Sequence, residues 1–275
     1  MRTRSFLSVF ATIILFSIKC YSQSKESVSF TPAIEDNSMF IEEAYNQENG
    51  VVQHISNFVF IPNLKDNFYY AFTQEWPAFG LKHQLSYTLQ YNSNARGDVT
   101  GFSDVLINYR YQLSYKDKYI VCAPRFSIII PTGNQDKGLG NGSWGMQVNL
   151  PLSKRWTNHF INHFNIGATY LFKVKDVERD FNKPLVSYFA GISTIWLISE
   201  KFNFMVEFIT NRTANPGLNN DVTYTNQTIL APGIRYAINI NKLQILPGLS
   251  VPFTFTKNSK TETGVFIYLS FEHEF

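Results

Sequence analysis

The sequence lacks an apolar run long enough to cross a membrane as a helix. Such a helix needs about 20 consecutive apolar residues, and the stretch FLSVFATIILFSI at residues 6–18 is shorter than that. The chain also has only two cysteines, Cys20 and Cys122. Helical membrane architecture is therefore excluded, and so is a small domain held together by several disulfides.

The short apolar run at the start reads instead as a secretory signal peptide, covering residues 1–22. Arg2 and Arg4 precede the run and KCYSQ follows it, which is the charged, apolar, small-residue order of such signals. We expect cleavage between Ser22 and Gln23. Cys20 could alternatively carry a lipid, but the residue before it is Lys19, where a lipid-modified cysteine follows a small residue.

An excess of charge of either sign is also missing from the expected mature chain. Removing residues 1–22 takes away three basic residues, and the remaining 21 of the 24 balance 21 acidic residues. A nucleic-acid partner would want a basic face, so we expect none. Cys122 is then alone, and a lone cysteine is usually a small buried hydrophobe.

What the sequence does have is alternating polarity. In LKHQLSYTLQYN at residues 81–92, apolar and polar side chains fall on opposite parities, as in a strand with one oily and one wet face. Similar segments recur along the chain without a competing helical period. They predict an all-β barrel of about 12 antiparallel strands within residues 50–275, at 51–60, 68–76, 81–91, 102–115, 119–130, 144–154, 160–173, 185–198, 202–211, 223–238, 243–256 and 264–275.

The connections between these segments alternate between short and long. The short ones are PAFG, KDK, RWTN, SEK and NINK; the long ones are IPNLKDN, NSNARGDVTG, PTGNQDKGLGNGS, VKDVERDFNKP, RTANPGLNND and KNSKTET. Transmembrane barrels have short periplasmic turns and long external loops. We therefore expect a barrel in the outer membrane of a Gram-negative bacterium, with both termini periplasmic and the oily parity facing lipid. The alternative is a soluble periplasmic sandwich or lipocalin-like barrel with the same alternation turned inside out.

Aromatic residues support the membrane interpretation. Trp76, Trp156 and Trp196 fall near the expected periplasmic ends, and Trp144 falls near an external loop, as interfacial aromatic girdles require. The last segment, VFIYLSFEHEF, alternates up to Phe275. It looks like the C-terminal strand that the barrel assembly machinery reads in outer-membrane proteins.

Residues 23–49 differ from the rest of the chain. The stretch is acidic, contains Pro32 and lacks sustained alternation. It could be a periplasmic extension, an extra strand, or a segment that folds into the lumen as a partial plug. The residues alone leave these three readings open.

Few motifs suggest chemistry. HISN at residues 54–57 resembles the His-x-Ser-Asn arrangement of outer-membrane phospholipases, so His54 and Ser56 form a lipase alternative. Phe58 and Val59 follow, however, where that pattern continues with glycine; a polar strand at the lumen edge is the simpler reading. His159 and His163 would lie about 13 Å apart on a strand, too far to share an ion. We expect no catalytic residue, no cofactor and no metal site.

The polar parity of the strands defines a candidate lumen. Its members either line a path for a small solute or pair across the bore and stiffen it. They are Gln84, Thr88, Asp104, Asn108, Arg110, Arg125, Glu207, Gln227, Arg235 and Glu272.

Four stretches resemble a known family: residues 41–54, 101–113, 124–156 and 230–240. The most specific element is IPTG followed by the glycine-rich GLGNG. They are similar to outer-membrane transporters grouped with the meta-pathway of phenol degradation, relatives of the long-chain fatty-acid channel superfamily. The resemblance implies a channel for passive diffusion of small molecules, among them hydrophobic or aromatic ones, and it carries no catalytic residue with it.

Overall fold

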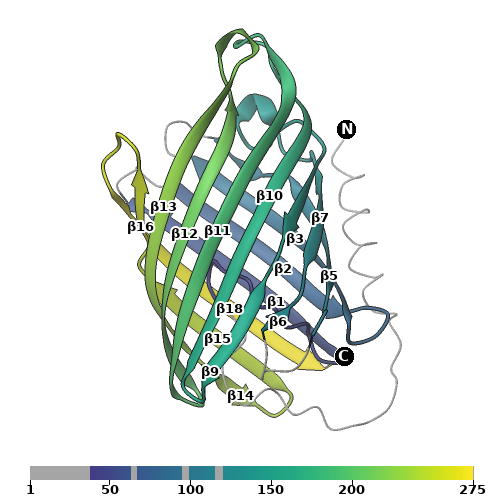
Figure 1. Ribbon diagram of the computed structural model, residues 1–275, viewed down its shortest axis with the longest axis vertical. Coiled ribbons are helices and arrows are strands. Elements are labelled where there is room, and N and C mark those ends of the chain that lie inside the picture. Colours follow the sequence, from purple (N-terminus) through teal and green to yellow (C-terminus); the bar gives the residue numbers. More distant parts are fainter. Residues whose placement is uncertain (1–37, 63–66, 95–98, 115–119, 275) are drawn as a thin grey trace.

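Each predicted segment of alternating polarity forms part of one antiparallel sheet that closes into a barrel of 12 strands (Figure 1). The computed structural model describes residues 38–62, 67–94, 99–114 and 120–274. The expected signal peptide, residues 23–37, the KDK turn and Phe275 lie outside them. Among the described residues no helix is long and apolar enough to span a membrane.

Several strands of the wall are interrupted and therefore carry two labels. The strands are β1 (Val51–Ile61), β2 (Asn67–Pro77), β3 (His83–Asn94), β4 (Val99–Phe102) with β5 (Val105–Tyr111), β6 (Val121–Cys122) with β7 (Arg125–Ile130), β8 (Gly145–Asn149) with β9 (Leu152–Thr157), β10 (Phe160–Asp176), β11 (Phe181–Ser199), β12 (Phe202–Pro216), β13 (Val222–Tyr236) with β14 (Ile238–Ile240), β15 (Leu243–Ser250) with β16 (Phe253–Thr256), and β17 (Glu262–Thr263) with β18 (Val265–Glu274). Two short 3-10 helices, η2 (Gln135–Lys137) and η3 (Leu218–Asn220), lie in connections.

The barrel closes through the first and last strands. β1 pairs with β2 on one side and with β18 on the other, in a continuous register from Val51 opposite Glu274 to Phe60 opposite Val265. Closure pairs the backbone groups that an open sheet would leave exposed at its edges. In hydrocarbon such unpaired groups cost several kcal/mol each, so this closure is what lipid requires.

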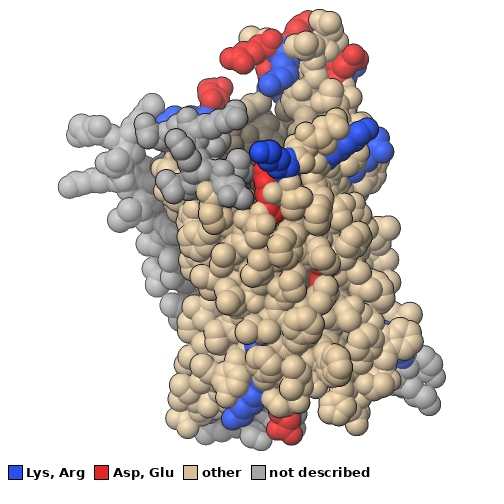
Figure 2. Space-filling view, turned by 90° about the vertical axis from the view of Figure 1, so that its left-hand side faces the viewer, with Lys and Arg blue, Asp and Glu red and all other residues tan. Residues whose placement is uncertain are grey.

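The oily parity faces outward, as predicted. On β3, Gln84 and Ser86 are buried inside the barrel, whereas Leu85 and Tyr87 lie on the opposite, outward parity. Across the outer wall large apolar side chains are exposed, and Figure 2 shows charged residues gathered toward the two ends with an almost uncharged band between them. A soluble barrel would bury this face, so the inside-out alternative is wrong.

The two ends of the barrel differ. One, here named the turn end, has the two-residue turns 158–159, 200–201 and 241–242; the other, the loop end, has the connection 131–144. Trp156 and Trp196 are exposed near the turn end, and Trp144 is exposed near the loop end. This is the arrangement expected of aromatic belts at two water boundaries.

Strands take up a large part of two of the expected long loops, which corrects the prediction. β10 extends to Asp176 and β11 begins at Phe181. In the same way, β12 extends to Pro216 and β13 begins at Val222. In Figure 1 these four strands rise above the rest of the wall at the loop end. A cluster of buried apolar side chains stabilises the extension; its members are Ile129, Leu171, Val174, Phe181, Leu185 and Ala214.

A charge on the outward parity is expected to disturb assembly. Phe208 lies mid-strand on β12, is 47% exposed and pairs with Ile192 and Leu230. Phe208→Arg should destabilise the folded protein by about 2–4 kcal/mol at the bilayer midplane, measured by urea-dependent folding into lipid vesicles. The matched control is Asn211→Arg on the inward parity of the same strand, which should cost much less; equal effects would contradict the assigned orientation.

Candidate functional site

The lumen contains the chain's own N-terminal segment, residues 38–48, here named the lumen segment. Seven backbone N–H groups of this segment donate to side chains of the barrel wall. Met39, Phe40 and Ile41 donate to the carboxylate of Glu207 at 3.2, 3.0 and 3.2 Å. Of the three readings left open by the sequence, the structure places these residues inside the barrel.

The remaining donors reach around the wall. The N–H groups of Glu42 and Ala44 donate to Asn165 Oδ1 at 2.9 Å and to Ser153 Oγ at 2.8 Å. Those of Asn46 and Gln47 donate to Gln112 Oε1 at 2.8 Å and Gln84 Oε1 at 2.7 Å. The acceptors come from β10, β9, the residue after β5, and β3. The segment therefore crosses the bore in contact with several separate strands.

Wall side chains also satisfy carbonyl groups of the lumen segment. Gln112 Nε2 donates to Ala44 O at 2.6 Å, Arg110 to Tyr45 O at 3.0 Å, and Asn165 Nδ2 to Glu42 O at 2.7 Å. Backbone groups buried away from water must be paired. Amide side chains can do this in both directions at once, and Gln112 and Asn165 each donate to and accept from the segment.

Apolar contacts fix the start of the segment. Met39 belongs to a buried cluster with Ile195, Met205 and Leu246, and the Phe40 ring lies 4.5 Å from that of Phe266. Ile41 lies against Gly191, where an added Cβ would come within 2.4 Å of Ile41 Cδ1. The wall is therefore shaped to receive these side chains.

The centre of the site is an ion cluster between the segment and the wall. Glu42 contacts Arg125 at 2.7 and 2.9 Å and Arg110 at 3.0 Å, and Glu43 lies 3.6 Å from Arg110. Loss of water contact would by itself raise the pKa of Glu42. The two guanidinium groups outweigh this effect and hold that pKa below its usual range.

The wall positions Arg125 independently of the segment. Its guanidinium donates to Asn108 Oδ1 at 3.0 Å, to Gln147 Oε1 at 2.7 Å and to Ser127 Oγ. A cavity of about 250 Å³ adjoins this group. Its lining combines residues 38–43 with wall side chains, among them Ile55, Thr73, Thr88, Leu106, Asn108 and Tyr268.

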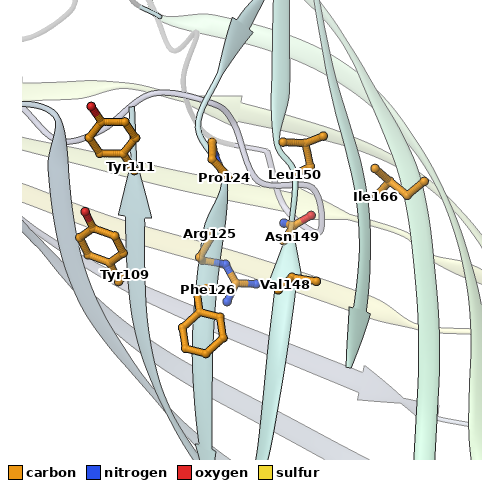
Figure 3. A pocket seen from close by; sticks show the side chains of 9 residues that line it. All are labelled: Tyr109, Tyr111, Pro124, Arg125, Phe126, Val148, Asn149, Leu150 and Ile166. Atoms are coloured by element: carbon orange, nitrogen blue, oxygen red, sulfur yellow. The ribbon is translucent and has the colours of Figure 1, made fainter. Parts of the chain in front are cut away.

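The outer wall has an apolar depression beside the same arginine. Between the pairs Cys122–Leu152 and Arg125–Asn149 lie Pro124 and Pro151, which have no N–H to donate to the ladder. Figure 3 shows the side chains that line the depression; they come from β5, β7, β8 and β10 and from Pro124 and Leu150, which lie at the strand interruptions. Arg125 lines both this depression and the lumen cavity.

The predicted lumen residues all lie on the inward parity, in different roles. Gln84, Arg110, Arg125 and Glu207 hold the lumen segment, while Thr88 and Asn108 line the cavity. Their assignment to a solute path stays a prediction.

The other members lie away from the ion cluster. Asp104 accepts from Gly133 and Asn141 and so holds the loop 131–144. Arg235 is buried beside the Tyr268 ring, Glu272 accepts from Gln53 at 2.6 Å, and Gln227 pairs with Thr256 toward the loop end.

Ser153, Gln112 and Glu42 were missed as site residues. Ser153 and Gln112 carry the parity of their strands, so their inward direction could have been read from the alternation. Glu42 could not be found in this way, because its stretch has no alternation.

The lipase pair faces the other way from the lumen. His54 and Ser56 lie on the outward parity of β1, since Ile55 and Asn57 line the cavity. His54 Nε2 lies 3.1 Å from His273 Nε2, and Ser56 Oγ lies 3.3 Å from the Tyr70 hydroxyl. β1 therefore borders the lumen through Ile55 and Asn57. The side chains of His54 and Ser56 point away from it, and each contacts a partner outside the pair.

Solved structures of outer-membrane channels share this fold. An outer membrane channel from Pseudomonas putida F1 matches with a TM-score of 0.68 at 11% identity, over 84% of this chain and 98% of that one. NanC porin matches with a TM-score of 0.51 at 11% identity, over 80% and 98%. KdgM porin matches with a TM-score of 0.50 at 7% identity, over 81% and 99%. At such identities the likeness is one of fold.

No family model and no curated protein matches the sequence. Of the resemblance to the meta-pathway transporters, the comparisons confirm only the fold, which is one found in solved outer-membrane channels.

The ion cluster makes docking of the lumen segment sensitive to acid. Because the pKa of docked Glu42 is lowered, its stabilisation is complete above the ordinary glutamate pKa of about 4.3 and is lost as the pH falls from there through the lowered pKa. Planar-bilayer conductance should rise between pH 5 and pH 3, values bracketing that pKa of about 4.3. Glu43, Glu75 and Glu207 also face the site, so the comparison is with Glu42→Gln. That variant should conduct more at pH 5 and respond less to acid; an identical pH profile would count against the assignment.

Proposed function

We propose that the protein is an outer-membrane channel through which small molecules, among them hydrophobic or aromatic ones, diffuse passively. Its outward apolar face is suited to outer-membrane lipid, and its inward polar face encloses a bore. The fold shared with outer-membrane channels supports the same function. The observation that carries the proposal is the cavity of about 250 Å³ inside a closed barrel with an apolar exterior.

In this conformation the lumen segment occupies the bore. Twelve strands enclose more space than the eight-stranded case, which side chains can fill. The segment takes up part of that space; its backbone continues into β1, and hydrogen bonds and ion pairs hold the rest of it against the wall. We infer that solute passage requires its displacement.

The proposal includes the orientation and the assembly partners. The turn end faces the periplasm, residues 1–22 direct secretion, and the barrel assembly machinery recognises β18 together with Phe275, the residue that follows it in the sequence. The expected partners are therefore outer-membrane lipid, this machinery and a small solute.

Replacing the lumen segment is the direct test of channel function. Substituting residues 38–47 by a Gly-Ser stretch of equal length removes the Glu42 contacts and the apolar anchors while keeping the chain length. Uptake of small uncharged solutes into liposomes should rise severalfold over the full native chain. The matched control replaces residues 257–261 at the loop end in the same way and should leave the uptake unchanged. Equal, negligible uptake by all three proteins would contradict the channel.

The lipase alternative has a separate test. Ser56→Ala should leave solute uptake unchanged, because Ser56 faces outward. The native protein with calcium should release no fatty acid from phospholipid vesicles. Calcium-stimulated release that disappears in Ser56→Ala would overturn this assignment.

A further inference from the structure

Glu42 occupies the position of a bound carboxylate ligand. Both of its oxygens contact Arg125, at 2.7 and 2.9 Å, in the two-pronged geometry with which arginine recognises carboxylates. Its side chain is 30% exposed, compared with 4% for Arg110 and 10% for Arg125. The carboxylate therefore borders the cavity, whereas the guanidinium groups are enclosed by protein.

The arginine side of this contact does not depend on Glu42. Asn108, Ser127 and Gln147 belong to β5, β7 and β8 and together fix the Arg125 guanidinium. Because the wall holds the planar guanidinium of Arg125, it keeps its orientation when Glu42 leaves. Such preorganisation reduces the free-energy cost of binding another carboxylate in place of Glu42.

The pairing of Arg125 restricts what the replacement can be. Glu42, Glu43 and Glu75 lie around Arg110 and Arg125, and Glu75 is held by Gln84 at 2.7 Å. Removing Glu42 takes away the carboxylate that contacts Arg125 with both oxygens, and breaking a buried ion pair in this way is strongly unfavourable. Another carboxylate restores the pairing, whereas a neutral solute cannot.

The cavity beside Glu42 has a mixed lining. Thr73, Thr88 and Asn108 contribute polar groups, and Ile55, Leu106 and Phe40 contribute apolar ones. Its volume of about 250 Å³ accommodates a small organic molecule. A ligand that suits this lining has one anionic end and a compact apolar body.

We propose that Arg125 and Arg110 form a binding site for small organic carboxylates, which Glu42 occupies in the closed conformation and which a ligand enters by taking its place. The inference rests on the proposed function, since it names the solute class of the channel. Ligand binding and release of the lumen segment are then one exchange reaction.

The test measures binding of sodium benzoate to the full chain in detergent by isothermal titration calorimetry, with benzamide as the neutral analogue. Glu42→Gln removes the internal competitor, so benzoate should bind roughly tenfold more tightly than to the native chain. Glu178→Gln, an exposed glutamate at the loop end, is the matched control and should leave the affinity unchanged. Benzamide affinity should not respond to either change.

The arginine variants complete the test. Arg125→Gln should lose benzoate binding and Arg125→Lys should weaken it, with folding checked by the mobility shift of heated and unheated samples. If Arg125→Gln fails to fold, the test rests on whether Glu42→Gln strengthens or weakens benzoate binding. Unchanged or weaker benzoate binding to Glu42→Gln would overturn the carboxylate site.

Bilayer conductance of the same preparations separates the two proposals. If the Gly-Ser variant conducts but benzoate binding does not depend on Glu42 and Arg125, only the carboxylate site is contradicted. If benzoate affinity changes among the variants as predicted but none of the proteins conducts, only the channel function is contradicted.

Discussion

A peptide that crosses the inside of a barrel has no neighbouring strand, so its backbone N–H and C=O groups must find partners elsewhere. The inward parity of this barrel supplies them: Glu207 accepts from three successive N–H groups, and Gln112 and Asn165 both donate and accept. This requirement accounts for the polarity of the wall. It also explains why carboxamide and carboxylate side chains, rather than aliphatic ones, lie where the lumen segment passes.

The same bonds leave the closed conformation only moderately stable. Fixing one residue of an extended chain costs about 1–2 kcal/mol, and a hydrogen bond to a charged group contributes about 1.5–3 kcal/mol. These magnitudes are comparable, so no single anchor dominates. Losing one anchor, such as the ion pairs of Glu42, then weakens docking of the whole segment. A ligand or a proton that acts on Glu42 can therefore shift the equilibrium.

Alternation allowed the wall to be predicted well, and the reason is physical. Lipid outside and water inside impose a period of two on every strand. The sequence therefore predicted that Leu85 faces lipid and that Gln84 faces the lumen. The extension of β10 to β13 was missed because these stretches contain turn-forming residues such as Asp180 and Asn220, which indicate long loops. In the structure, apolar packing of Val174, Phe181 and Leu185 keeps the chain on either side of the turn in strands. The position of the lumen segment could not be predicted, because its polar partners come from β3, β5, β7, β9, β10 and β12 and its own stretch has no alternation. Arg110 and Arg125 could be placed in the lumen, but their pairing with Glu42 could not.

Amide hydrogen exchange of residues 39–47 in the intact protein tests the central claim most directly. If wall side chains hold this backbone, the amides of Met39, Phe40, Ile41, Glu42, Ala44, Asn46 and Gln47 exchange far more slowly than in a free peptide, by more than roughly a hundredfold. Exchange of all these amides at free-peptide rates, while the strand amides stay protected, would contradict the account.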